Sequence, residues 1–224
     1  MDYTVLLKCN LFSGLKAADI QALLETIPHS IRQYGKAETV FRLLDTANHV
    51  GIVLQGRVQA QKTFPNGSQG NVSVKNAGEI IGAAATFSKK DLFPCDIIAL
   101  EPSDILMISK DSMLLLMQKD IRILDNFTAE IATATYMLQQ KLELLSYSGI
   151  AQKAAFYLLK REMETGKQKI RIPGSMSEWA LSMNVSRPSL HRELKKLEND
   201  GVLVYAPPFI EILDKDALQD VLGK

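Results

Sequence analysis

The spacing of apolar residues along the chain changes three times, and each change predicts a different kind of structure. Up to about residue 30 the chain is predicted to be helical, because apolar positions between Ile20 and Ile27 recur at helical spacing. From 31 to about 108 the apolar residues form short β-branched clusters, separated by turn signals such as Pro65-Asn66-Gly67. Many short strands in succession indicate a barrel or jelly roll.

A long amphipathic helix is predicted from about residue 121 to 145. A heptad stripe on so long a helix favours a two-stranded coiled coil between two copies of the chain. The alternative is a helix that packs the same stripe on its own domain. Residues 146–149 (Ser-Tyr-Ser-Gly) end the helix and form a predicted hinge, followed by another helix to about residue 164. The stripe consists of Leu124, Phe127, Ile131, Ala134, Leu138 and Leu145.

Residues 175–197 have the pattern of a helix-turn-helix. Asn184 lies at the predicted turn and tolerates a left-handed backbone, while Ser186 can cap the second helix. Pro188 suits the first turn of that helix, where its missing N–H is not needed. The segment from Val202 to Leu213 then predicts a β-hairpin, so this part of the chain is predicted to be a winged helix.

The predicted second helix concentrates positive charge on its exposed face. Between residues 186 and 196 there are four Lys or Arg residues and one acid, whereas the net charge of the chain is only +1. A basic helix of this kind attracts phosphates and brings its first residues to base edges in the major groove. The alternative is an ordinary solvated helix face. The candidate DNA contacts are Ser177, Ser186, Arg187, Ser189, His191, Arg192, Lys195 and Lys196.

Composition limits the other possibilities. The chain has 224 residues, of which 46% are hydrophobic, so it can bury one or two cores. We find no apolar run long enough for a transmembrane helix and no signal peptide, so a cytoplasmic protein without membrane contact is expected. The two cysteines, Cys9 and Cys95, form neither a disulfide framework nor a metal set, and each is a thiol switch or a buried structural thiol.

In its order of motifs the chain resembles the Crp/Fnr family of bacterial regulators over nearly its full length. The resemblance rests on 11–15 (Leu-Phe-Ser-Gly-Leu), 54–58 (Leu-Gln-Gly-Arg-Val), 78–82 (Gly-Glu-Ile-Ile-Gly), the long helix and 186–194 (Ser-Arg-Pro-Ser-Leu-His-Arg-Glu-Leu). It implies an α+β chain with an N-terminal, jelly-roll-like β-roll, a long central dimerisation helix and a C-terminal winged helix-turn-helix. The expected divisions are 1–120 for a cyclic-nucleotide-binding-like effector domain, 121–146 for the dimerisation helix and 147–224 for the DNA-binding domain.

Two departures from the family pattern affect the expected ligand and the expected DNA site. Relatives that bind cyclic nucleotide have a glutamate for the ribose where this chain has Ala83, and an arginine for the phosphate where it has 92–96 (Leu-Phe-Pro-Cys-Asp). An effector other than a cyclic nucleotide is therefore expected, uncharged or hydrophobic, unless the pocket is a filled core. Pro188 stands where many relatives have a glutamate that contacts cytosine, so half-site preference should differ. The candidate pocket residues are Gly82, Ala83, Ala85, Thr86, Phe87, Phe93 and Cys95.

No catalytic motif, metal site or cofactor is predicted. Iron–sulfur relatives need about four cysteines, mostly near the N-terminus, where this chain has only Cys9. A redox- or haem-dependent regulator and a β-roll that regulates another protein remain alternatives. The expected function is a homodimeric transcription regulator that binds an inverted repeat in double-stranded DNA. RNA polymerase is an expected partner if the protein is an activator.

Overall fold

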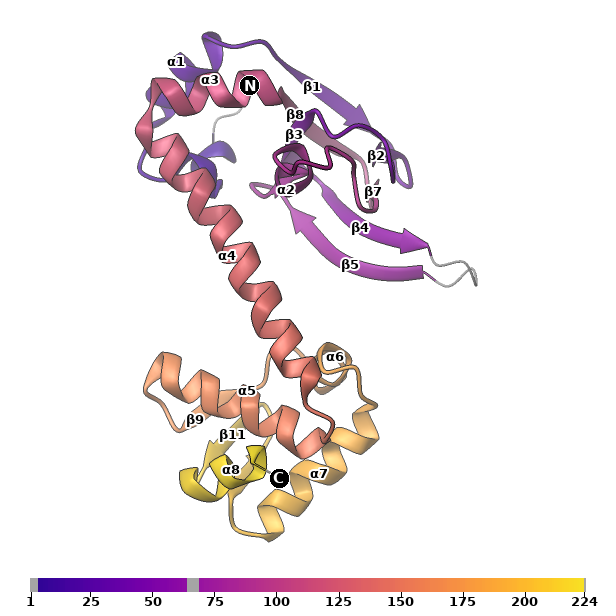
Figure 1. The fold of residues 1–224 in the computed structure, drawn as a ribbon, viewed down its shortest axis with the longest axis vertical. Helices are drawn as coiled ribbons and strands as arrows, with labels where there is room; N and C mark the ends of the chain where they lie inside the picture. Colours follow the sequence, from indigo (N-terminus) through magenta and orange to yellow (C-terminus); the bar gives the residue numbers. More distant parts are fainter. Residues whose placement is uncertain (1–3, 64–68, 224) are drawn as a thin grey trace. The chain divides into compact units, whose positions relative to one another are not determined.

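The chain divides into two compact units in the computed structural model, which describes residues 4–63 and 69–223 (Figure 1). One unit comprises Met1–Ala134 and the other Thr135–Lys224. The division falls within the 26-residue helix α4 (Ile121–Ser146), which contributes residues to both units. No helix in the described residues is both long enough and apolar enough to cross a membrane.

In its described residues the first unit contains two four-stranded antiparallel sheets, in the orders β1-β8-β3-β6 and β2-β7-β4-β5. β4 and β5 form a hairpin that pairs Arg57 with Asn76 and Thr63 with Gln69, and the predicted turn at Pro65-Asn66-Gly67 lies outside the described residues. The strands are β1 (His29–Tyr34), β2 (Thr39–Phe41), β3 (His49–Gln55), β4 (Arg57–Thr63), β5 (Gln69–Asn76), β6 (Ile80–Ile81), β7 (Asp96–Ala99) and β8 (Ser103–Ser109).

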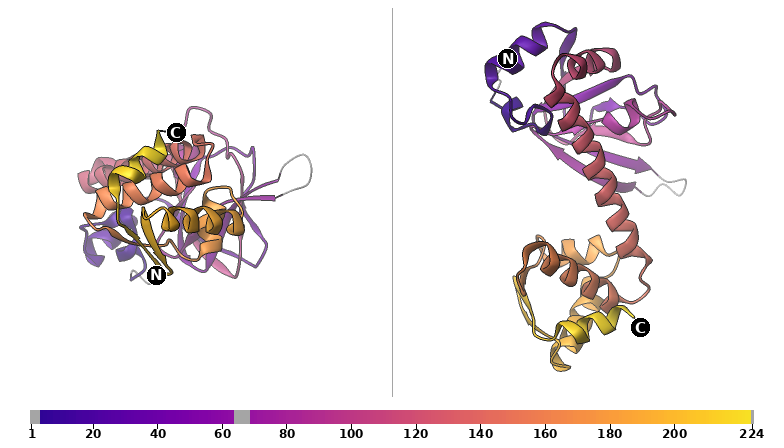
Figure 2. Two further views of the ribbon diagram at one scale, coloured as in Figure 1. Left: turned by 90° about the horizontal axis from the view of Figure 1, so that it is seen from below. Right: turned by 60° about the vertical axis from the view of Figure 1, so that its left-hand side comes forward.

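α1 (Ala17–Glu25) and α3 (Lys110–Lys119) lie beside the start of α4, on one side of the strands (Figures 1 and 2). Apolar residues of α1 and α3 join Ile52 and Leu106 of the sheet and Ile123 of α4 in one buried cluster. The start of α4 is therefore part of the core of this unit. The helical elements are η1 (Leu6–Lys8), η2 (Asn10–Phe12), α1 (Ala17–Glu25), α2 (Ala83–Thr86) and α3 (Lys110–Lys119).

The second unit packs helices against a three-stranded antiparallel sheet of order β10-β11-β9. Its core centres on Trp179, which is 1% exposed, and on leucines of α7. The predicted winged helix is confirmed, whereas the C-terminal helix α8 was not predicted. The elements are α5 (Ile150–Thr165), β9 (Lys169–Arg171), α6 (Met176–Ser182), α7 (Arg187–Asn199), β10 (Leu203–Ala206), β11 (Phe209–Ile212) and α8 (Lys215–Leu222). With the β-roll and the long helix, these elements confirm the predicted α+β fold.

Candidate DNA interface and effector pocket

The turn between α6 and α7 follows from a few local residues. Asn184 adopts a left-handed backbone with φ of 56°, as its place in the sequence predicts. Ser186 caps α7, because its hydroxyl oxygen accepts a hydrogen bond from the backbone N–H of Ser189 at 3.2 Å. α6 is capped in the same way by Ser175, which exchanges hydrogen bonds with Glu178. Both helices of the motif therefore begin at fixed residues.

Helix α7 buries one face and exposes the opposite one. Leu190 and Leu194 are fully buried in the core of the second unit, and Leu197 is 5% exposed. Arg192 is exposed and, by helical spacing, lies opposite these leucines. Within the described residues Arg187, Arg192 and Lys196 have exposed side chains and form no ion pair or hydrogen bond through them. These three cations are available to an anionic partner.

Two other candidate contacts on α7 are held by strand β10. Nδ1 of His191 lies 3.3 Å from the hydroxyl of Tyr205, and Nζ of Lys195 lies 2.6 Å from a carboxylate oxygen of Glu198 and 5.5 Å from the centre of the Tyr205 ring. Glu198 also accepts a hydrogen bond from the backbone N–H of Tyr205 at 2.9 Å. Hydrogen bonding to Lys195 and to that N–H lowers the pKa of Glu198, which favours its charged form. Sequence reasoning missed Glu198 and Tyr205, which orient these two candidates.

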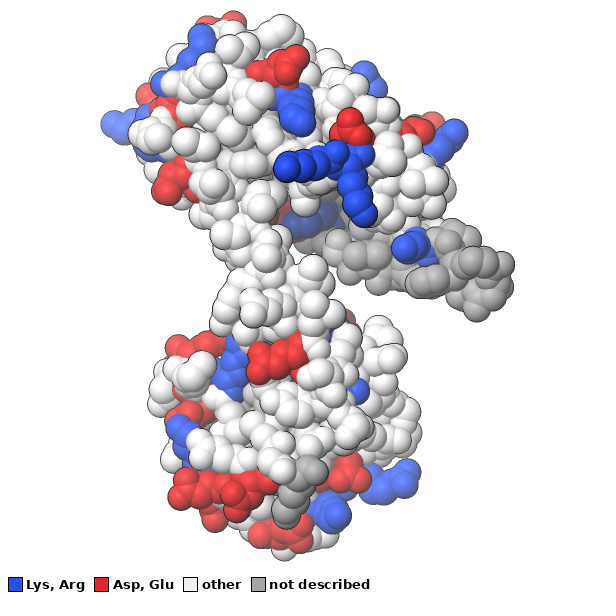
Figure 3. All heavy atoms as spheres, in the orientation of Figure 1, with Lys and Arg blue, Asp and Glu red and all other residues white. Residues whose placement is uncertain are grey.

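The remaining candidates lie at the starts of the two helices. Ser177 is exposed in the first turn of α6, and Ser186 is the exposed cap of α7. Ser189 is half-buried and its hydroxyl lies 2.8 Å from that of Ser186. Basic and acidic side chains are interspersed over the visible face of both units (Figure 3), so any attraction for DNA depends on local groups such as those of α7.

A cavity of about 230 Å³ lies in the first unit between the β-roll and α4. Five of the seven predicted pocket residues line it: Gly82, Ala83, Ala85, Phe93 and Cys95. The other two lie elsewhere, because their side chains have other partners. Thr86 is fully buried and donates a hydrogen bond to the backbone oxygen of His49 at 2.8 Å, and the ring of Phe87 packs against Phe127 with centroids 4.8 Å apart.

Aromatic stacking shapes one wall of this cavity. The rings of Phe41 and Phe93 are stacked with centroids 4.3 Å apart. Gly82 has φ of 77°, and a Cβ added there would lie 3.0 Å from Phe41 and 3.2 Å from Phe93. Any side chain at this position would combine a left-handed backbone with tight contacts to both rings, so glycine is favoured where the chain enters α2.

Polar side chains at the cavity are few, and its two charged ones already have partners. Lys75 lines it, but its Nζ lies 3.1 Å from a carboxylate oxygen of Glu79. Glu130 of α4 also lines it and accepts a hydrogen bond from the side chain of Asn10 at 3.0 Å. Burial, and then the neighbouring Asp96, raise the pKa of Cys95, which favours its neutral thiol. The cavity is lined mainly by neutral, apolar groups, and sequence reasoning missed its α4 wall of Glu130, Ile131 and Ala134.

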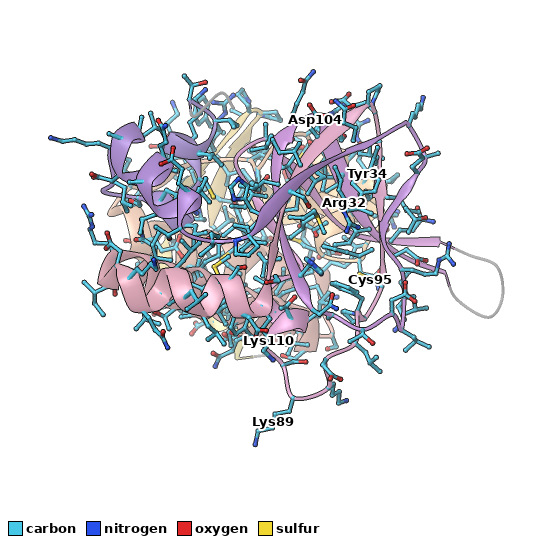
Figure 4. The ribbon with its side chains drawn as sticks, turned by 90° about the horizontal axis from the view of Figure 1, so that it is seen from above. Arg32, Tyr34, Lys89, Cys95, Asp104 and Lys110 are labelled. Carbon is cyan, nitrogen blue, oxygen red and sulfur yellow. The ribbon has the colours of Figure 1, made fainter. Side chains whose placement is uncertain are left out.

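Other lysines of the first unit lie outside the cavity lining. Lys62 is exposed, and it is close enough for its positive charge to act on the thiol of Cys95. Lys110 lies over the ring of Phe87, its Nζ 5.6 Å from the ring centre. Lys89 is exposed and projects away from the unit (Figure 4). No arginine is found among the described residues that line the cavity. Among the described residues that line the cavity, Lys75 is the cation that could contact a bound phosphate, and it is already paired with Glu79.

The stripe predicted on α4 divides into a buried and an exposed part. Phe127 is 6% exposed and belongs to the core of its own unit, together with the partly buried Ile131. This part of the stripe packs on its own domain, which was the alternative to a coiled coil. Phe127 is therefore too buried to contact a second copy of the chain. Ala134, Leu124, Leu138 and Leu145 are exposed.

Sequence reasoning missed the other row of the exposed face of α4. Ile121 is 72% exposed and Leu142 62% exposed. These two residues are 21 positions apart in the sequence, which is three heptads. The helix therefore has two rows of residues at heptad spacing. Positions 124, 131, 138 and 145 are all aliphatic, and positions 121, 128, 135 and 142 are Ile, Thr, Thr and Leu.

Comparisons with known proteins agree with this architecture. Residues 31–120 match the cyclic nucleotide-binding domain family, and residues 152–221 match the Crp-like helix-turn-helix domain family. The chain is 22% identical to the cyclic AMP receptor protein of Thermus thermophilus, over 94% of this chain and 95% of that protein.

Solved structures show the same fold. The catabolite activator protein of Thermus thermophilus is 21% identical and gives a TM-score of 0.57, covering 96% of this chain and 98% of its own. A CooA mutant from Carboxydothermus hydrogenoformans is 16% identical with a TM-score of 0.60, covering 98% of this chain and 95% of its own. With a cyclic nucleotide-binding domain and a Crp-like helix-turn-helix domain in one chain, this protein belongs to the Crp family of DNA-binding transcription regulators.

Proposed function

We propose that the protein acts as a homodimer that binds an inverted repeat in double-stranded DNA, with α7 of each copy in the major groove. The observation that carries this proposal is the exposed positive charge of α7: Arg187 at its first residue and Arg192 and Lys196 on its outer face, all without an ion pair in the described residues. Two-fold symmetry of the protein requires half-sites about one helical turn apart, about 10–10.5 base pairs.

Each candidate residue has a role that follows from its place on the motif. Arg187, Ser189 and Arg192 would contact base edges, and the guanidinium of Arg192 matches the two acceptors of guanine. Ser177 and Lys196 would contact phosphates. Lys195 shares its ammonium with Glu198, so we assign it a smaller share of phosphate binding. His191 and Ser186 would support the helix through Tyr205 and through the cap.

The exposed apolar face of α4 supports the proposed dimer. Five aliphatic side chains there are between 39% and 72% exposed, which is more apolar surface than one helix normally leaves in water. Burying this face against the same face of a second copy would place two DNA-binding units on one two-fold axis. If the dimer activates transcription, RNA polymerase would be its further partner.

The cavity beside α4 supports an effector that is small, uncharged and largely apolar. A cyclic nucleotide carries a charged phosphate, and a buried phosphate needs an unshared cation. The cavity offers Lys75, which is paired with Glu79, and it has Ala83 at the position that is glutamate in nucleotide-binding relatives. An effector would act by binding two states of the protein unequally. The wall that α4 contributes gives such a ligand direct contact with the proposed dimer helix.

Selection of random duplexes by the purified protein, followed by sequencing, tests DNA binding. Enrichment of a two-fold repeat without added ligand is the expected result, and absence of enrichment with and without cell extract would refute the proposal. Arg192→Ala should then cost about 1–3 kcal/mol of binding free energy and relax the preference at one position. Lys196→Ala should weaken binding to all DNA sequences alike and lower the salt dependence of binding.

Titration calorimetry with cyclic AMP tests the proposed effector class. We expect no saturable heat from the protein as it stands. Saturable binding at micromolar cyclic AMP would show that the assignment of an uncharged effector is wrong, while leaving the DNA-binding proposal intact.

A further inference from the structure

The last carbonyls of α6 have partners in the following turn and in α4. The carbonyl of Ala180 accepts the backbone N–H groups of Met183 and Val185, and the carbonyl of Leu181 accepts the N–H of Asn184 at 3.0 Å. The carbonyl of Ser182 instead accepts a hydrogen bond from Nζ of Lys141, on α4. The carbonyls at the end of a helix have no partners within it, so these contacts complete the end of α6.

The next carbonyl along the chain has a second lysine as its partner. Nζ of Lys153, on α5, donates to the backbone oxygen of Met183 at 3.2 Å. Two ammonium groups from different helices therefore hold two consecutive peptide carbonyls at the start of the turn. Cations are favourable at this end of a helix, because the carbonyls there carry partial negative charge.

The arrangement of Lys141 is not that of a solvated surface lysine. Its side chain is half-buried, and burial followed by the positive charge of Lys153 lowers its pKa. Two like charges held close together are unfavourable unless each has an acceptor of its own. The carbonyls of Ser182 and Met183 are those acceptors.

The two held carbonyls lie immediately before the residues that set the direction of α7. Met183 ends α6, Asn184 has φ of 56°, and Ser186 begins α7. Fixing the peptide planes on either side of Met183 restricts the torsions through which the chain turns from one helix into the next. The direction of α7 therefore depends on where α4 and α5 place their ammonium groups.

We propose that Lys141 and Lys153 are positioning residues for DNA recognition, which fix the helix-turn-helix turn and thereby link the end of α4 to the orientation of α7. This inference rests on the proposed function of α7 as the DNA-reading helix. It assigns both lysines a role without contact with DNA. That role separates them from Lys196, whose ammonium is free in the described part of the chain.

The salt dependence of DNA binding separates positioning from phosphate contact. A lysine that contacts phosphate lowers the salt slope by about one when it is removed, because a counterion is no longer released. Lys141→Met and Lys153→Met keep the length of the side chain but remove the donor. Each should lower affinity for the selected repeat about tenfold, the equivalent of one hydrogen bond to a charged group, and leave the salt slope unchanged. Lys141→Arg, which keeps a donor, should restore most of the affinity.

Lys160→Met is the matched control. Lys160 is also a half-buried lysine on α5 beside α4, but its Nζ lies over the ring of Tyr136 at 5.2 Å and 3.7 Å from a carboxylate oxygen of Glu164. This variant loses the same charge without touching the turn. Its affinity and salt slope should stay near those of the parent protein.

Hydrogen exchange tests the same inference without DNA. The amides of Asn184 and Val185 should exchange faster in Lys141→Met than in the parent and in Lys160→Met, while the amides of α5 keep their protection. Parental exchange and parental affinity in Lys141→Met, or a salt slope lowered by about one, would overturn the inference. If the parent binds no repeat but the exchange result holds, the proposed function fails and the structural link remains. If Lys141→Met unfolds, Lys153→Met supplies the same comparison.

Discussion

The hydroxyl of Tyr205 on β10 lies 3.3 Å from Nδ1 of His191 on α7, and the two rings meet edge to face with centroids 5.4 Å apart. Tyr205 is 7% exposed, so most of its ring is buried in the second unit. The contact joins the wing to the helix that we propose reads DNA, and it explains why His191 is oriented although it lies at the surface.

Removal of that hydroxyl should weaken the second unit. Tyr205→Phe keeps the ring but leaves His191 without its partner, and we expect the free energy of unfolding to fall by about 1 kcal/mol. The chain has one tryptophan, Trp179 in the core of this unit, so its fluorescence during urea unfolding follows the unit selectively. Tyr147→Phe is the control, because the Tyr147 hydroxyl makes no hydrogen bond in the described residues. Equal midpoints for both variants would show that the bond contributes nothing.

Gly56, between β3 and β4, should be much harder to replace than Gly14, another left-handed glycine of the first unit. Gly56 has φ of 81°, and an added Cβ would lie 2.3 Å from Oγ of Ser103 and 2.5 Å from the backbone oxygen of Pro102. Gly14 has φ of 78° and no atom within 4 Å of an added Cβ. Gly14→Ala should therefore lower the free energy of unfolding only by the strain of the left-handed conformation, about 1 kcal/mol. Gly56→Ala should cost at least about 2 kcal/mol more, because backbone atoms must also move. Calorimetric unfolding of both variants measures the difference, and equal losses would contradict the steric argument.

The two thiols should differ in reactivity. Burial raises the pKa of Cys9 from its usual 9.0 to about 11, whereas Cys95 is only partly buried. At pH 8 a maleimide should therefore modify Cys95 first, since the thiolate is the reactive form and Cys9 is also inaccessible. Mass spectrometry of a time course reads this directly. Faster modification of Cys9 would mean that the N-terminal segment opens readily.

The raised pKa of Cys9 also predicts a loss of stability at high pH. The folded state holds the thiol proton more tightly than the unfolded state, so this contribution is fully present below about pH 9 and is lost as the pH rises toward 11. Cys9→Ala should lose less stability than the parent over this interval in urea unfolding at a series of pH values. A parallel pH dependence in the two proteins would refute the assignment.

Local sequence signals predicted the second unit well, because its key features depend on neighbouring residues. The left-handed Asn184, the Ser186 cap and the leucine spacing of α7 each act within one or two turns of chain, and each is found in the structure. Most strands of the β-roll were similarly visible as β-branched clusters, but β1 (His29–Tyr34) was not among them, because its sequence is mostly polar. Local patterns of this kind define elements and motifs.

Features that depend on distant pairs could not be read from the sequence. Phe127 continues the heptad stripe in sequence, yet its ring faces Phe87 of its own unit. Thr86 and Phe87 are adjacent to cavity residues in the chain but point elsewhere, because α2 is a single turn and successive side chains diverge. Glu198 lies three residues after Lys195, so their ion pair could have been read from helical spacing, whereas the hydrogen bond from the N–H of Tyr205 to Glu198 could not. The positions of Phe127 and Thr86 were decided by tertiary partners.

The exposed face of α4 gives the prediction that bears most directly on the proposed dimer. Leu138 and Leu142 are 61% and 62% exposed, and they occupy both rows of the heptad pattern. Because neither packs in a core of its own chain, replacing them should not affect the folding of a single copy. The double substitution Leu138→Glu and Leu142→Glu would place charges in the seam of a coiled coil, where each must lose water without a partner. Sedimentation equilibrium should then show monomers where the parent shows dimers.

Met163→Glu is the matched control for that experiment. Met163 is 75% exposed on α5, away from the heptad rows, so it adds a negative charge at an equally exposed apolar position. This variant should remain a dimer and should bind the selected repeat as the parent does. The double variant should bind the repeat far more weakly but keep its affinity for single half-sites, because each α7 is intact and only the second contact is lost. If the double variant had the same dimer dissociation constant as the parent, the dimer contact would lie elsewhere than on α4.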